Sequence, residues 1–194
     1  MLQARPTELE TPSRSALASP ALTYPIALLM AEIGDACDGP ADAMAARVTS
    51  ALRNAAMVPD LLSEELRAPR AGCYARHIIA ADPAGRFTLL AIVWSPGQFS
   101  LPHAHDTWCA YAVAENTLTE TLFDFDPRSG KAMAGNTAQR EPGYACFAPA
   151  GLEQIHRLGN AGGVGAISIH AYGVEGSRVG THVNRLMDVV ERER

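Results

Sequence analysis

The sequence predicts a mainly β protein, a sandwich or small barrel of short strands with helices packed on its outside. After Pro69 the chain contains short runs rich in β-branched and aromatic residues, separated by Gly and Pro. Before Pro69, apolar residues recur at intervals of three and four, the spacing of an amphipathic helix. Because the helical part precedes the β part instead of alternating with it, a parallel α/β sheet is not expected.

The first third of the chain is predicted to be helical after a loose arm. Residues 1–20 contain several prolines and lack the basic start and apolar centre of a signal peptide. A single domain, residues 21–194, begins with a helical part, residues 21–68. Two amphipathic helices are expected within residues 24–57, and a shorter third around residues 61–66. The apolar positions behind the two helices are Ile26, Leu29, Met30 and Ile33, then Met44, Val48, Leu52 and Met57.

The β part is expected over residues 69–182, followed by a C-terminal segment, residues 183–194. Its short runs recur with turn signals between them, which is typical of a sandwich or small barrel. The predicted strands are residues 74–80, 87–94, 109–113, 118–125, 145–147 and 164–172.

Composition indicates an ordinary globular protein. The 194 residues include 16 Lys and Arg against 21 Asp and Glu, a net charge of -5 that does not suit a nucleic-acid coat. No run reaches the ~20 apolar residues of a membrane span. Four cysteines without a Cys-x-x-Cys pair predict reduced thiols and a cytoplasmic location.

The sharpest local signal is a His-x-His pair, His103 and His105, six residues after Gly97. Side chains alternate along a strand, so the two imidazoles must project from one face. This geometry suits a single metal ion. A pair of polar residues on a solvated strand face is the alternative interpretation.

A second signal follows downstream, where a turn delivers another histidine. The pattern is Gly143-x5-Pro149-x-Gly151, and His156-x3-Asn160 comes after it. Two such patterns in this order predict a metal site more strongly than either one alone. We therefore expect His156 to join the first two histidines as a ligand.

These two patterns resemble the motifs of the cupin superfamily over residues 70–182. The resemblance implies a cupin β-barrel (jelly roll) with the N-terminal helices packed outside. The chain departs from the motifs twice: Cys109 stands where the first motif has a metal-ligating Glu, and two extra residues precede His156. Three histidines remain as ligands. An acid elsewhere is the alternative, from Asp106, Glu115 or Glu120, although Asp106 has the wrong strand parity relative to His105.

Three histidines together with Cys in the Glu position resemble the cysteine dioxygenase family of non-haem iron enzymes. Ser168-x-His170-x-Tyr172 is similar to the family's Ser-His-Tyr relay, and Tyr74-x-Arg76 to its carboxylate clamp. Each pattern has period two, so its members share a strand face. The resemblance implies an Fe(II) cofactor and a catalytic role for Ser168, His170 and Tyr172.

The substrate-binding residues follow from the same resemblance. Arg76, with Tyr74, would grip the substrate carboxylate through its planar guanidinium. Trp108 and Cys109 lie beside the histidine motif, and Arg178 is placed to return over the pocket from a loop. In the family a Cys near this place can form a thioether with the relay Tyr. Here its spacing is one residue shorter, so we predict that the crosslink is absent or partial.

The implied reaction converts a small thiol carboxylate and O2 to a sulfinic acid. Arg76 favours cysteine, whereas Thr107-Trp108 is similar to the branch that acts on 3-mercaptopropionate. Mercaptosuccinate is a third substrate, with Arg178 holding its second carboxylate. A different class, a non-redox cupin that binds or isomerises a small acid or sugar, stays open. Neither nucleic acid nor membrane is an expected partner, and the oligomeric state is not predicted.

Overall fold

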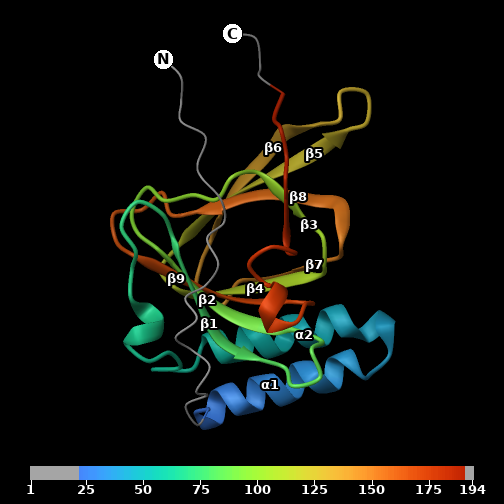
Figure 1. Cartoon of the computed structure of the whole chain (residues 1–194). Helices are drawn as coiled ribbons and strands as arrows, with labels where there is room; N and C mark the ends of the chain where they lie inside the picture. The colour runs from blue at the N-terminus through green and yellow to red at the C-terminus, as the bar shows by residue number, and fades with distance from the viewer. Residues whose placement is uncertain (1–21, 191–194) are drawn as a thin grey trace.

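Two helices precede two five-stranded antiparallel sheets in the computed structural model, which describes residues 22–190 (Figure 1). The strand order is β1-β2-β9-β4-β7 in the first sheet and β10-β3-β8-β5-β6 in the second. The predicted mainly β fold with outer helices is confirmed, but no strand pairing within these residues joins the sheets into a closed barrel. The strands are β1 (Ala75–Ala81), β2 (Thr88–Trp94), β3 (His103–His105), β4 (Cys109–Glu115), β5 (Leu118–Asp126), β6 (Lys131–Arg140), β7 (Ala145–Ala148), β8 (Gly151–Gly159), β9 (Ala166–Tyr172) and β10 (Asn184–Leu186).

Both long helices form where the apolar periodicity places them. α1 (Tyr24–Cys37) and α2 (Ala41–Ala56) lie against the outer side of the first sheet (Figure 1). The predicted third helix is instead a single 3₁₀ turn, Glu65–Arg67. Asp60 ahead of it adopts a left-handed conformation with φ of 53°, which interrupts a helix because the Cβ of an L-residue crowds the backbone there.

Four strands of the second sheet lie outside the predicted list: β3 and β8, which carry the histidine patterns, and β6 and β10. β6 pairs with β5 at the sheet edge, and most of its side chains are exposed, so it carries no alternating apolar pattern. β10 pairs with β3 and lies in what the sequence suggests is only a C-terminal segment. Together they extend the sheet that carries the histidine motif.

The first sheet is buried on both faces, and this places the candidate site. Side chains of its outer face such as Leu89 and Ile169 belong to one core cluster with Leu52 of α2. Its inner face meets the second sheet, and alternation therefore directs every second residue of β2 and β9 into the space between the sheets. The predicted arm, residues 1–20, lies outside the described residues. No helix in residues 22–190 is long and apolar enough to cross a membrane.

Candidate metal centre

Three histidines meet between the two sheets. His103 and His105 lie on β3, and His156 lies opposite His103 on the neighbouring strand β8. One ring nitrogen from each lies within 4.8 Å of the others, and all three residues are buried. Alternation along β3 thus places the two imidazoles on one side, as the sequence spacing predicts.

The electrostatics of these rings fit a cation. Burial and the neighbouring His156 lower the pKa of His103 to about 3 and that of His105 to about 2. Both rings are therefore neutral near pH 7 and keep a lone pair for a metal. His103 Nδ1–H donates to the Leu101 carbonyl at 2.8 Å, which leaves Nε2 free, and His105 Nδ1 is buried without a partner in the described residues. The donor set fits one metal ion.

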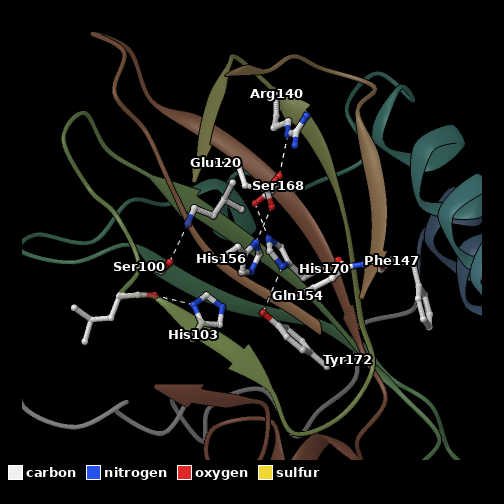
Figure 2. A network of polar contacts seen from close by, with 12 residues as sticks. Ser100, His103, Glu120, Arg140, Phe147, Gln154, His156, Ser168, His170 and Tyr172 are labelled. Atoms are coloured by element: carbon white, nitrogen blue, oxygen red, sulfur yellow. Dashed lines mark hydrogen bonds and ion pairs between the residues drawn. The ribbon is translucent and has the colours of Figure 1, made fainter. Parts of the chain in front are cut away.

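The buried carboxylate of Glu120 is hydrogen-bonded to Nδ1 of the third histidine, His156 (Figure 2). His156 Nδ1–H donates to Glu120 Oε1 at 2.7 Å, and Arg140 Nε–H donates to Glu120 Oε2 at 2.8 Å. Burial raises the pKa of Glu120, but the hydrogen bonds from His156 and Arg140 outweigh it and hold the pKa below its usual value. An ionised carboxylate therefore fixes the tautomer and orientation of His156.

The acids considered as a fourth ligand lie in other places. Asp106 forms an ion pair with Arg185 on the outside, at 2.6 Å, and Glu115 forms one with Arg67. Glu120 contacts the outer nitrogen of a histidine, so it supports the metal group without being a member of the described three-residue set. The three-histidine interpretation is the one that the geometry favours.

A cavity opens beside the histidines and brings the predicted clamp to them. The guanidinium of Arg76 is anchored by the Val179 carbonyl, with Nη2 to oxygen at 3.1 Å. It lies over the ring of Tyr172, 5.9 Å from the centroid. The cavity is lined by Tyr74, Arg76, Ile92, Trp94, Ser100, His103, His156, Leu158, His170, Tyr172 and Asn184.

Four side chains of the first sheet form a directed hydrogen-bond chain, three of which Figure 2 labels. Trp94 Nε1–H donates to Ser168 Oγ at 2.9 Å, and Ser168 Oγ is hydrogen-bonded to His170 Nε2 at 2.8 Å. Burial holds the pKa of His170 well below its usual value, so the ring is neutral. Its Nδ1 atom lies 3.4 Å from the Tyr172 hydroxyl, and a proton on Nδ1 with the Ser168 hydroxyl donating to Nε2 satisfies both contacts.

Comparison with known proteins identifies the family. Residues 72–179, more than half of the chain, match the family Cysteine dioxygenase type I. The chain belongs to this family. Membership indicates a cupin thiol dioxygenase, which is a dioxygenase type of oxidoreductase. This agrees with the resemblance found in the sequence motifs.

Solved structures support the cupin fold of this family member. A Klebsiella pneumoniae protein with a double-stranded β-helix domain is 17% identical, with a TM-score of 0.50 over 67% of this chain and 93% of that one. Weaker likenesses are TT1209 from Thermus thermophilus (20% identity, TM-score 0.46, 60% and 96% covered) and an oxalate oxidase in complex with glycolate (17%, 0.44, 59% and 59%). The Klebsiella pneumoniae structure is the one that shows the fold.

The Cys and relay Tyr of this cysteine dioxygenase family member lie directly opposite each other. Cys109 on β4 is the register partner of Tyr172 on β9, and the two side chains interact. Burial raises the pKa of both groups well above their usual values, so the thiol and the hydroxyl are protonated. The short spacing after His105 does not keep the two side chains apart.

Three predicted substrate-binding residues, Trp108, Cys109 and Arg178, do not line the cavity. Cys109 instead lines a neighbouring pocket together with His105 and Glu120. Trp108 points to the opposite side from Cys109 and stacks on Phe147, with ring centroids 5.6 Å apart. Arg178 is exposed, because the 3₁₀ turn Gly176–Arg178 directs it outward while the next residue, Val179, is buried. Alternation along the chain directs Trp108 away from the cavity, and the geometry of the turn does the same for Arg178.

Several functional side chains are missing from the predicted set. Glu120 enters the sequence prediction only as an alternative ligand, and its partner Arg140 comes from the polar strand β6. The sequence suggests that Trp94 is a core residue, yet its indole N–H is the first donor of the hydrogen-bond chain through Ser168 to His170. Asn184 lies beyond the predicted β region and still lines the cavity. Strand parity marks the inward position of Trp94, whereas the other three depend on pairings between distant segments.

Proposed function

We propose that the protein is an Fe(II)-dependent thiol dioxygenase that oxidises a small thiol carboxylate, with cysteine favoured, to its sulfinic acid. The observation that carries the proposal is one cavity shared by three kinds of group. His103 and His156 of the three-histidine cluster line it together with Arg76 and Tyr172. A cytoplasmic location, where thiols stay reduced, belongs to the same proposal.

His103, His105 and His156 would hold the iron through one coordination face. Bound there, the iron supplies the redox chemistry that transfers both atoms of O2 to sulfur. The protein's own contribution is to position the substrate and to exclude side reactions. The buried lining of the cavity, which includes Trp94 and Leu158, keeps water from the sulfur.

Arg76 would bind the substrate carboxylate. Its guanidinium is already held by the Val179 carbonyl and by the face of the Tyr172 ring, so little side-chain entropy is lost on binding. The fork of N–H groups left on the cavity side matches a carboxylate. This contact fixes the sulfur end of a short thiol toward the histidines.

Tyr172 would act as a hydrogen-bond donor to the reacting group. In the tautomer that carries its proton on Nδ1, His170 donates to the Tyr172 oxygen, and Tyr172 keeps its own proton for donation. Trp94 and Ser168 hold His170 in the tautomer that this requires. In that tautomer the hydrogen-bond chain keeps a proton on Tyr172, which lines the cavity.

The test is sulfinate formation and O2 uptake with cysteine, 3-mercaptopropionate, mercaptosuccinate and cysteamine, using protein loaded with Fe(II) or Zn(II). We expect activity with iron alone and cysteine as the best substrate. Arg76→Ala should lower kcat/KM for cysteine by about 10- to 150-fold, the value of a charge-assisted hydrogen bond. It should hardly affect cysteamine, which lacks a carboxylate.

The exposed Arg47 on α2 provides the matched control. Arg47→Ala should leave all four substrates unchanged. Activity with zinc, or none with any thiol, would instead support a non-redox cupin. Equal loss across the four thiols in Arg76→Ala would assign Arg76 to the fold, and a preference for 3-mercaptopropionate or mercaptosuccinate would replace cysteine while keeping the reaction class.

A further inference from the structure

Asn184 lines the cavity and carries a side-chain oxygen without a partner among residues 22–190. It lies on β10, directly opposite His105 on β3, and lines the same cavity as Arg76 and Tyr172. Its Oδ1 atom is buried and has no hydrogen-bond partner in residues 22–190. A buried polar atom without a partner is costly, so the observation points to a ligand that supplies the missing donor.

Several other polar groups of the cavity are already engaged or can only donate. Arg76 can only donate. Both ring nitrogens of His170 are engaged by Ser168 and Tyr172. The hydroxyl oxygen of Ser100 already accepts the backbone N–H of Leu158 at 3.1 Å, and no carboxylate lines the cavity among the described residues.

We propose that Asn184 selects thiols that carry an amino group, by accepting a hydrogen bond from the substrate nitrogen. The inference rests on the proposed function and narrows its substrate class to amino thiols. Arg76 on β1 and Asn184 on β10 belong to different sheets, so a ligand between them is held by its carboxylate from one sheet and by its amine from the other. The amide oxygen accepts an N–H from an amine or an ammonium group, whereas it repels a second carboxylate.

The experiment compares wild type with Asn184→Leu, which keeps the size and removes the acceptor. Iron-loaded protein is assayed with cysteine, cysteamine and 3-mercaptopropionate, and the last of these lacks nitrogen and serves as the internal control. We expect kcat/KM to fall about 3- to 10-fold for both amino thiols, the range of one neutral hydrogen bond, with 3-mercaptopropionate within about twofold of wild type. Leu186→Ala, on the same strand and 56% exposed, should change nothing.

Anaerobic melting curves provide a second readout that does not require turnover. Cysteine should raise the melting temperature of the iron-loaded wild type more than 3-mercaptopropionate does, and Asn184→Leu should abolish this difference. If Asn184→Leu does not fold, Asn184→Ala makes the same comparison. Equal losses of kcat/KM for all three thiols would overturn the inference. A greater loss for 3-mercaptopropionate would also overturn it, and would mean that the amide N–H of Asn184 binds a carboxylate. If no thiol is oxidised but the melting difference depends on Asn184, the reaction proposal fails and amine recognition stands.

Discussion

Replacing Glu120 by Gln should weaken metal binding without touching a ligand. Glu120 is 3% exposed, and its two oxygens accept hydrogen bonds from His156 and Arg140 at 2.7 and 2.8 Å. A carboxylate that accepts the Nδ1–H proton makes the other imidazole nitrogen a stronger base. Gln keeps the shape and one acceptor oxygen but removes the charge.

The magnitude follows from that arrangement. Loss of such a supporting group lowers metal affinity by about 10- to 100-fold, or about 1.4 to 2.7 kcal/mol. The metal-free fold should lose about 1.5 to 3 kcal/mol at most, the value of hydrogen bonds to a charged group. Arg140 keeps a favourable environment without Glu120, since its guanidinium lies 4.2 Å from the centre of the Tyr144 ring.

Fe(II) dissociation constants, measured anaerobically by competition with a chelator, separate the two effects when combined with denaturant unfolding of the metal-free protein. Glu115→Gln is the matched control, because Glu115 pairs with Arg67 at a site where both side chains are at least a third exposed. It should cost less than about 1 kcal/mol of stability and leave metal affinity unchanged. Wild-type affinity in Glu120→Gln would refute the reasoning and assign the orientation of His156 to packing alone.

Two further predictions concern acid stability and covalent chemistry. Because burial lowers the pKa of His103, His105 and His170 in the folded state, the unfolded chain takes up protons near pH ~6.5 while the folded chain does not. The unfolding free energy of the metal-free protein should therefore fall as pH drops from about 7 to 5, and a flat profile would contradict this. The Cys109–Tyr172 crosslink should be absent or partial, because burial keeps both the thiol and the hydroxyl protonated although they face each other. The intact mass should show mainly the uncrosslinked chain. A product lighter by two hydrogen atoms that predominates, and that is lost in Cys109→Ser, would show that the cross-strand pairing outweighs the sequence spacing.

The sequence predicts those parts of the site that depend on strand parity. His103 and His105 share a face because they are two residues apart, and Tyr74 and Arg76 border the cavity together for the same reason. Ser168, His170 and Tyr172 are a third instance. These relations are local, so a pattern of a few residues is enough to predict them.

The parts that escape prediction depend on pairing between distant strands. Arg140 reaches Glu120 because β6 pairs with β5, but β6 is a polar edge strand without apolar alternation. Asn184 reaches the cavity because β10 pairs with β3, which no turn signal indicates. Neither relation is encoded in a short pattern, and both require the register of the second sheet.

The charges around the site give a physical reason for a thiol carboxylate as ligand. A divalent cation on three neutral imidazoles would add two positive charges next to Arg76, and the nearest buried carboxylate, Glu120, is already paired with Arg140. In a buried site such an excess is costly unless the ligand brings negative charge. A thiolate against the metal and a carboxylate against Arg76 supply it at the two places where it is needed. With the ligating Glu of the cupin motif replaced by Cys109, the charge that an acid would have neutralised is left for the substrate.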